Sequence, residues 1–325
     1  MKVLVTGASG FLGSWVAQRL SEQGHSVRAL VRKSSNKKFL ETLANVELAY
    51  GAIEEAEKVH EACAGMDAVI HAAGAVKARN EDEFKQTNIE GTRNVVEGAK
   101  KHGVKRLVLV SSLEASGPSE DGKPVPLEQS RPITAYGRSK RQAELVALDA
   151  AGALDVVILR PTAIYGPRDQ EILEAFKAVN HGLLASIAGG KSLGTFIYAS
   201  DCAEACIRAL TAKVPSGSVY FVDDGTGAVD QKTMLGDIAR ALGKKHLLRA
   251  SLPTGALKLV ATGVQAFGKL TNRAVMLTPE KANMLLAHWV CSSERTRADL
   301  GWEPKVPWSE GVALTARWYK DNDWL

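Results

Sequence analysis

Residues Val3–Gly13 read VLVTGASGFLG, and this stretch decides the fold. A short β-branched and apolar run leads into glycines at positions 7, 10 and 13, and apolar residues then recur at a helical spacing. The pattern predicts a strand, a tight turn and a helix whose free N–H groups and dipole favour a bound pyrophosphate. We expect Gly7 to allow the turn, Gly10 to let the backbone approach the phosphates and Gly13 to let the helix pack closely on the strand. A glycine-rich turn without a ligand is the less favoured alternative, because the preceding strand, the following helix and the N-terminal position all agree.

The composition is that of an ordinary soluble globular protein. The 325 residues are 45% hydrophobic and 24% charged, and this length suggests one large or two intimately joined domains. The net charge of +5 is spread over short basic clusters without interleaved aromatic residues, so we expect no nucleic-acid partner. No apolar run reaches membrane-spanning length, so we expect no integral membrane protein. The first strand starts almost at Met1, which predicts that no signal peptide precedes it and that the protein is cytoplasmic.

The four cysteines show no paired metal-ligand spacing, so we expect no metal site. Cys202 and Cys206 lie four residues apart in a helical pattern and are expected to be core thiols. In the same helix, Asp201 with Glu204 fits a capping box, which is a structural role.

Strands alternate with helices over the first half of the chain, which predicts an α/β fold of the Rossmann type. We expect a doubly wound parallel sheet built from residues 1–166 plus 193–222. Residues 167–192 plus 223–325 have longer loops, and we assign them to a smaller, mostly helical C-terminal substrate lobe. The apolar helix expected at Leu257–Leu270 is interpreted as a packing element, with a substrate-facing or a membrane-surface helix as open alternatives.

The end of the second strand, Val27–Val31, should lie near the adenosine ribose of a bound dinucleotide. An acidic residue there would bind the 2′-hydroxyl of NAD, but this chain has Arg32 and Lys33 instead. Cationic groups suit a 2′-phosphate, so NADP(H) is the preferred cofactor and NAD(H) the alternative. After the fourth strand, His71 is expected to be structural, and the small residues at 72–74 should let the backbone approach the cofactor.

A Tyr-x-x-x-Lys pair marks the candidate chemistry. Tyr136 and Lys140 share one face of a helix, and the lysine cation should lower the pKa of the tyrosine phenol. Tyr136 could then exchange a proton with a substrate oxygen that Ser112, at the end of strand five, polarises. Each piece alone is weak, but the order of glycine loop, serine and tyrosine–lysine helix is much more specific.

The whole set resembles the extended short-chain dehydrogenase/reductase family across nearly the full chain, closest to its 3β-hydroxysteroid dehydrogenase and dihydroflavonol reductase branches. The resemblance implies that Ser112, Tyr136 and Lys140 are the catalytic residues. Ala52 stands where the family usually has an aspartate that contacts adenine, so that contact must come from elsewhere. The cofactor contacts that the resemblance and the motifs together imply are Gly7, Ser9, Gly10, Phe11, Leu12, Gly13, Arg32, Lys33, Ile53, Ala72, Ala73, Gly74, Asn88, Ser111, Lys140, Pro161 and Ile164.

The activity so implied is hydride transfer between nicotinamide and a secondary alcohol or ketone. An NDP-sugar epimerase that retains its cofactor and a non-enzymatic NADP-binding regulatory protein are the alternatives. Dehydration is disfavoured because Leu113 stands where sugar-nucleotide dehydratases carry an acid. The family fold also leaves a homodimer open, through helices that carry residues 88–100 and 136–148, with Ala143, Val146 and Ala147 as contact candidates.

The substrate pocket should lie beyond the strand ends, between the catalytic residues and the second lobe. Cations that could clamp a nucleotide-sugar diphosphate are sparse, with Arg168 and Lys191 nearest by family position. We therefore expect a largely apolar small-molecule substrate, such as a steroid, a terpenoid or a flavonoid-like compound. The apolar candidates for this pocket are Leu183, Leu184, Ile187, Leu257, Val260, Val264 and Phe267.

Overall fold

In the computed structural model, which describes residues 1–271 and 278–325, seven parallel strands form one central sheet. Their order is β11-β6-β5-β4-β1-β2-β3, so the chain starts in the middle of the sheet and winds outward in both directions. The strands are β1 (Lys2–Thr6), β2 (Ser26–Val31), β3 (Val46–Tyr50), β4 (Ala68–His71), β5 (Arg106–Val110), β6 (Asp155–Pro161) and β11 (Ser218–Val222). This is the doubly wound arrangement predicted from the alternating pattern.

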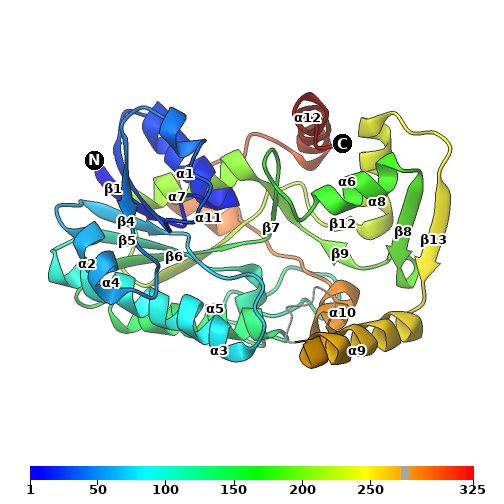
Figure 1. The fold of residues 1–325 in the computed structure, drawn as a ribbon, viewed down its shortest axis with the longest axis horizontal. Helices are drawn as coiled ribbons and strands as arrows, with labels where there is room; N and C mark the ends of the chain where they lie inside the picture. Colours follow the sequence, from blue (N-terminus) through cyan, green and yellow to red (C-terminus); the bar gives the residue numbers. More distant parts are fainter. Residues whose placement is uncertain (272–277) are drawn as a thin grey trace.

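Helices cover both faces of this sheet (Figure 1). One face carries α1 (Phe11–Glu22), α7 (Ala199–Thr211) and α11 (Glu294–Leu300). The other face carries α2 (Ala56–Cys63), α4 (Gly91–Lys101) and α5 (Ala135–Asp149). Val3 and Val5 point into the first core and Leu4 into the second, which explains why this strand is apolar at successive positions.

Two glycines permit the tight connection between β1 and α1. Gly7 has φ +71°, and a Cβ there would lie 2.6 Å from the backbone nitrogen of Ala73. A Cβ on Gly13 would lie 2.1 Å from the carbonyl oxygen of Gly7, so any side chain would push the helix off the strand. Gly10 is less confined, since its Cβ would meet that same oxygen at 3.1 Å.

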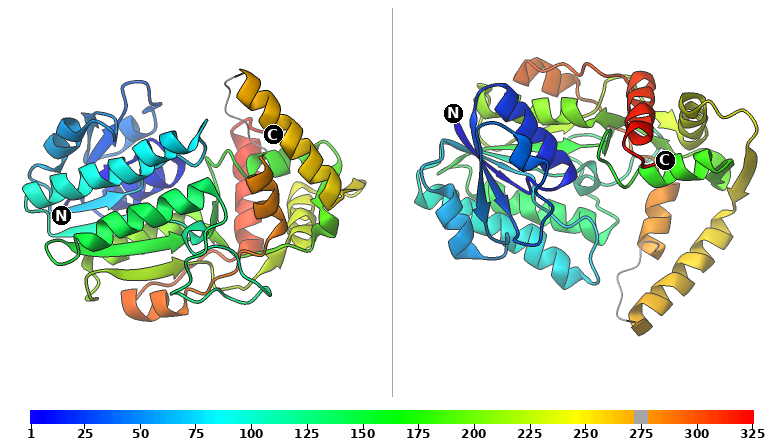
Figure 2. Two further views of the ribbon diagram at one scale, coloured as in Figure 1. Left: turned by 90° about the horizontal axis from the view of Figure 1, so that it is seen from below. Right: turned by 45° about the horizontal axis from the view of Figure 1, so that its top comes forward.

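A smaller lobe lies beyond the carboxyl ends of the strands (Figures 1 and 2). Its core is rich in aromatic rings, among which Tyr165 packs against Trp308 with ring centroids 4.8 Å apart. Its helices are α6 (Leu173–Asn180), α8 (Gln231–Leu242), α9 (Thr254–Thr271), α10 (Pro279–Leu286) and α12 (Trp308–Asp321). Three strand pairs complete the molecule, formed by β7 (Ala163–Tyr165) with β10 (Phe196–Tyr198), β8 (Leu183–Ile187) with β13 (Leu248–Leu252), and β9 (Leu193–Gly194) with β12 (Val229–Asp230).

The remaining turns of helix lie in the connections between these elements. They are η1 (Leu40–Thr42), α3 (Glu81–Phe84), the π-helical η2 (Lys85–Glu90), η3 (Leu113–Ala115) and η4 (Ala188–Gly190).

One expectation from the sequence is wrong. Asp201 does not cap its own helix; its carboxylate accepts hydrogen bonds of 2.8 Å from the backbone N–H groups of Lys305 and Val306. Trp302, from the range 223–325 that we assign to the second lobe, is buried in the core under the central sheet and donates its indole N–H to the Asp201 carbonyl at 3.0 Å. Both contacts join residues far apart in the sequence, and the local pattern does not encode them. The expectation of core thiols at Cys202 and Cys206 is confirmed, since both are fully buried.

Candidate functional site

A cleft of about 530 Å³ opens at the carboxyl ends of β1, β2 and β4. Its walls hold eight of the residues expected to contact a cofactor: Gly7, Ser9, Gly10, Arg32, Ile53, Ala72, Ala73 and Gly74. Five further polar residues line the cleft, and no motif in the sequence marks them: Ser35, Asn36, Glu54, Lys77 and Thr87. Because glycines and alanines leave the backbone bare next to a helix N-terminus, this cleft fits a dinucleotide.

The other expected cofactor residues lie outside the walls of this cleft. Leu12 and Ile164 pack in or against the core, and Gly13 serves the close approach of helix to strand. Phe11 is the first residue of α1, and Pro161 ends β6. Lys33 is exposed and follows Arg32 without lining the cleft.

Asn88 is buried and braces the loop after β4. Its side-chain oxygen accepts a hydrogen bond of 2.7 Å from the Ala75 N–H, and its amide donates to the Ala75 carbonyl and to the Ser139 hydroxyl. His71 lies between two hydroxyls, those of Thr6 at 2.6 Å and Thr92 at 3.0 Å. Burial lowers the pKa of His71 to about 3, with a further contribution from Lys140, so its imidazole is neutral.

The start of α5 sets the position of the predicted tyrosine and lysine. Thr134 caps this helix by accepting a hydrogen bond of 2.9 Å from the Gly137 N–H, and its own hydroxyl donates to the Glu114 carboxylate at 2.6 Å. Lys140 lies one turn beyond Tyr136, and its ammonium group donates to the Val110 carbonyl at 2.7 Å. Burial lowers the pKa of Lys140 to about 8, against the opposing effect of the Glu144 carboxylate.

The pKa of Tyr136 departs from the expected direction. Desolvation by the surrounding protein raises it well above its ordinary value, and the Glu114 carboxylate raises it further. The neighbouring Ser112 hydroxyl acts in the opposite direction. The expected lowering by Lys140 is therefore wrong for this structure, because desolvation and the Glu114 carboxylate raise the phenol pKa, while the Lys140 ammonium group is directed to the Val110 carbonyl. The structure does bring Ser112 and Tyr136 together, and both keep part of their surface open.

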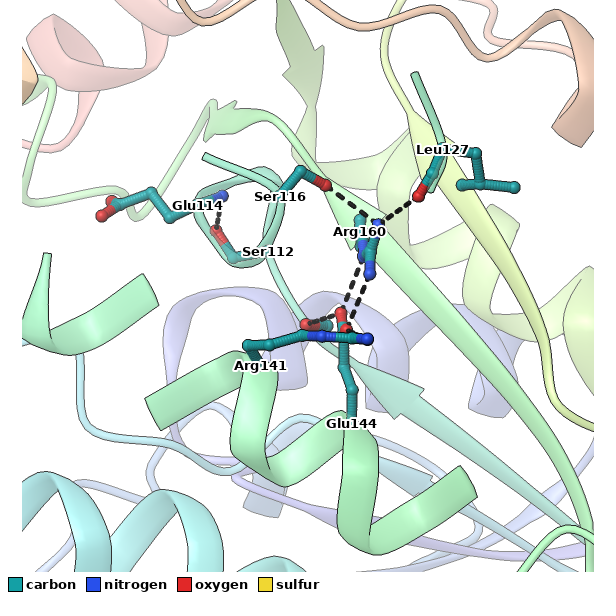
Figure 3. Close-up of polar contacts among 8 residues, drawn as sticks. Ser112, Glu114, Ser116, Leu127, Arg141, Glu144 and Arg160 are labelled. Atoms are coloured by element: carbon teal, nitrogen blue, oxygen red, sulfur yellow. Dashed lines mark hydrogen bonds and ion pairs between the residues drawn. The ribbon is translucent and has the colours of Figure 1, made fainter. Parts of the chain in front are cut away.

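A buried ion pair behind these residues holds the site together, and sequence analysis missed it. Arg160 of β6 donates to both carboxylate oxygens of Glu144 on α5, each at 2.8 Å, and the two side chains are 3% and 0% exposed. The Ser111 hydroxyl donates to the Glu144 carboxylate at 2.6 Å. Ser111 was expected to contact the cofactor, and in the structure it supports this ion pair. Arg160 also donates to Ser116 and to the Leu127 carbonyl, both at 2.9 Å, so one guanidinium joins α5 to the loop that follows Ser112 (Figure 3).

The two cations expected near the substrate differ in their surroundings. The Arg168 guanidinium is sandwiched between the rings of Trp15 and Phe39, 4.2 and 4.0 Å from their centroids, and it donates to Gln18. Lys191 is exposed after η4 and does not line the cleft.

The apolar candidates of the second lobe divide into two groups. Leu184 packs against the lobe core, and Leu257 is buried with Ala261 and Ala282. Val260 and Phe267, by contrast, are exposed.

The second lobe contacts the start of α5, the helix that carries Tyr136, through α10. The Glu280 carboxylate accepts a hydrogen bond of 2.8 Å from the Ala135 N–H, beside Tyr136, and another of 3.0 Å from Arg138. The free N–H at the start of α5 is thereby satisfied by a side chain from the other lobe.

Two of the three residues proposed for a dimer contact are buried within the protomer. Ala143 and Ala147 are fully buried within the protomer, and Val146 packs against the core between α5 and the sheet.

Comparison with known proteins gives the chemistry of the family. Residues 3–222 match the family described as "NAD dependent epimerase/dehydratase family". The ceramide reductase of Caulobacter vibrioides is 30% identical, over 99% of this chain and 96% of that protein. A 4-hydroxy-2-methyl-3-oxo-4-farnesyl-3,4-dihydroquinoline-1-oxide ketoreductase of Stigmatella aurantiaca is also 30% identical, over 96% of this chain and 95% of that protein.

Among solved structures, the UDP-glucose 4-epimerase of Thermotoga maritima has the same fold. It superposes with a TM-score of 0.80 and covers 99% of each chain, at 22% sequence identity. At this identity the match shows the architecture alone.

Breaking the buried pair should destabilise the protein severely. We expect Glu144→Gln to lower the free energy of unfolding by about 3–5 kcal/mol, because the Arg160 guanidinium would remain buried without its counter-charge. Chemical denaturation measures this loss. The matched control is Glu22→Gln, which breaks an exposed pair with Arg19 and should cost less than about 1 kcal/mol. Equal effects of the two substitutions would contradict the central role of the buried pair.

Proposed function

This chain belongs to the NAD-dependent epimerase/dehydratase family and is an NAD(P)-dependent oxidoreductase, and from that premise we propose its reaction. Hydride passes between NADP(H) and the carbinol or ketone carbon of a largely apolar small molecule. Ser112, Tyr136 and Lys140 are the catalytic residues. The observation that carries this proposal is the position of the Ser112 hydroxyl next to the Tyr136 phenol beyond the carboxyl end of β5, with both side chains partly open to solvent.

Bound nicotinamide supplies or accepts the hydride. In the direction of reduction, the hydroxyls of Ser112 and Tyr136 bind the substrate carbonyl oxygen and polarise it. Tyr136 then gives its proton to that oxygen as the alcohol forms. A phenol whose pKa is raised holds this proton firmly at neutral pH, so Tyr136 rests in the protonated form that reduction requires.

Lys140 lies one helical turn beyond Tyr136 and assists the proton transfer. With its pKa lowered to about 8, the buried ammonium group stays mainly protonated at neutral pH but gives up its proton more readily than an ordinary lysine. It can therefore stabilise the phenolate that forms after proton transfer, or pass on a proton to restore the phenol.

We propose an apolar substrate because the Arg168 guanidinium, a cation expected near the substrate, already has partners within the protein. The aromatic sandwich and Gln18 already occupy the Arg168 guanidinium, so it does not offer a free clamp for a sugar-nucleotide diphosphate. The two relatives named above are reductases whose names denote a lipid and a farnesylated quinoline, and this supports the same substrate class here. An NDP-sugar epimerase remains the second candidate within the family.

Turnover of two compound panels distinguishes these functions. We expect apolar ketones to be reduced with NADPH, giving a net absorbance change at the wavelength of reduced nicotinamide, and NDP-sugars to remain unchanged. Tyr136→Phe should lower kcat by at least about 100-fold, because the proton donor is lost. Conversion confined to NDP-sugars without net cofactor change would establish the epimerase instead. Biological activity that survives Tyr136→Phe would favour a regulatory NADP-binding protein.

Preference for NADP(H) is proposed from Arg32, which lines the cleft at the end of β2 and forms no ion pair with any residue in the described ranges. We expect NADPH to bind more tightly than NADH, and Arg32→Ala to weaken NADPH binding about 10- to 100-fold because a charge-assisted contact is lost. Binding of NADH should change little. Fluorescence titration of both cofactors measures this.

Lys33→Ala is the matched control for Arg32→Ala, because the neighbouring cation does not line the cleft. Tighter binding of NADH by the unmodified protein, or equal losses in the two variants, would refute the assignment of Arg32.

The carboxylate of Glu114 should control the pH profile of alcohol oxidation, which needs the Tyr136 phenolate. Glu114→Gln removes the negative charge that raises the phenol pKa, so the rise of kcat/KM with pH should move to lower pH. The control is Glu280→Gln, since Glu280 is also a carboxylate at the start of α5 but does not shift the Tyr136 pKa. Coincident profiles for Glu114→Gln and the unmodified protein would exclude this coupling.

A further inference from the structure

Exposed apolar side chains gather at one edge of the second lobe, on β13 and α9. Five of the nine large apolar side chains that are exposed in the described ranges lie there. Leu248 on β13 is 72% exposed and Leu259 on α9 is 76% exposed. The other three are Leu252, Val260 and Phe267. Contiguous apolar surface of this kind marks an interaction site in a globular protein.

The helix α9 has an outward sector without polar side chains. Successive residues turn by about 100° around a helix, so Leu257, Ala261 and Val264 share one stripe. Leu257 and Ala261 are fully buried against α10 and β8. A second, broader sector on the far side combines Leu259, Val260, Gly263, Ala266 and Phe267. A third sector gathers the polar residues Lys258, Thr262 and Gln265. Because these polar side chains lie together, none of them interrupts the apolar outward face along the helix.

The strand pair β8–β13 continues this surface. Leu248, Ala250 and Leu252 alternate onto one face, opposite Leu183, Ala185 and Ile187 of β8. Ile187 packs against the buried cluster of α9, whereas Leu184, which points the other way, packs against the lobe core. The outer face of the strand pair and α9 therefore adjoin at the outer end of the lobe, where Figure 2 shows α9 standing clear of the sheet domain.

The charged residues of this edge are all cations. Residues 241–268 contain no aspartate or glutamate and four cations: Lys244, Lys245, Arg249 and Lys258. This segment thus accounts for four of the five net positive charges of the chain. All four side chains are exposed, and none forms an ion pair with a residue that the structure describes.

We propose that β13 and α9 dock on the surface of an anionic lipid bilayer. The apolar sector would enter the boundary between headgroups and acyl chains, and the surrounding cations would lie at the level of the anionic headgroups. A second copy of this chain fits less well, because two identical cationic edges would repel each other. Within the described ranges, no helix is both long enough and apolar enough to cross the bilayer, so the contact is interfacial.

The docking surface is linked to the catalytic site through α10. The buried face of α9 packs on Ala282 of α10, and Glu280 of the same helix contacts the start of the catalytic helix beside Tyr136. A lipid surface at α9 would bring apolar compounds dissolved in the membrane to the side of the molecule where α10 meets the start of α5. This last consequence rests on the proposed substrate class, whereas the docking itself does not.

Co-sedimentation with vesicles tests the docking without any turnover. The full chain is mixed with phosphatidylcholine vesicles with and without 30% phosphatidylglycerol, a mole fraction of about one third chosen to give a strongly negative surface. We expect binding to the anionic vesicles that weakens with added salt, and little binding to phosphatidylcholine alone. Leu248→Gln/Leu259→Gln should weaken this binding at least about tenfold, because two apolar side chains no longer enter the bilayer.

Two further variants test the electrostatic contribution to binding and its specificity for this surface. Lys244→Gln/Lys245→Gln should weaken binding by about fivefold for each lysine removed and should flatten its salt dependence. Leu145→Gln, at an exposed leucine on α5, is the control and should bind like the unmodified protein. Melting temperatures close to that of the unmodified protein verify folding, which exposed positions should not disturb.

The proposal is overturned if anionic vesicles do not bind the protein, or if phosphatidylcholine vesicles bind it equally well. It is also overturned if Leu248→Gln/Leu259→Gln binds vesicles unchanged. A fall in molecular mass by sedimentation in that variant would assign the surface to a second copy of the chain instead. None of these outcomes depends on the substrate, so the docking and the proposed function fail separately.

Discussion

The bidentate ion pair between Arg160 and Glu144 is the interaction on which the geometry of the candidate site depends. It ties β6, which lies next to the edge strand β11, to the helix that carries Tyr136 and Lys140. Because both charges are out of water, each stabilises the other only in this geometry, and neither can be displaced without leaving an unpaired buried charge. Ser111 and Ser116 attach to the same pair, so the loop that holds Ser112 is fixed by the same contact.

The cofactor cleft depends on a different constraint, which is the absence of side chains. The connection after β1 and the one after β4 approach so closely that a Cβ on Gly7 would touch the backbone of Ala73. Bare backbone on both sides lets a dinucleotide approach the N-terminus of α1. The second lobe is held across this cleft by contacts at its rim, including the ion pair of Lys77 with Glu171 and the indole of Trp15 on the Pro167 carbonyl.

The molecule thus presents three chemically distinct surfaces. The glycine-lined cleft suits a phosphate-bearing cofactor, the site around Tyr136 suits proton transfer, and the outer edge of the second lobe is apolar and cationic. The helix α10 connects the last two surfaces, since Glu280 accepts a hydrogen bond from the start of α5 while Ala282 supports α9.

The sequence by itself determined the features that depend on local spacing. The glycine loop, the parallel strands and the placement of Tyr136 and Lys140 on one helical face follow from periodicities of two and 3.6 residues and from glycine stereochemistry. Only the tertiary structure decided the features that depend on burial and on distant partners. These are the ion pair of Arg160 with Glu144, the upward direction of the Tyr136 pKa, and the packing of Trp302 under the sheet. The physical reason is that desolvation and long-range pairing depend on which distant surfaces come together in the fold, and a local sequence pattern does not specify those surfaces.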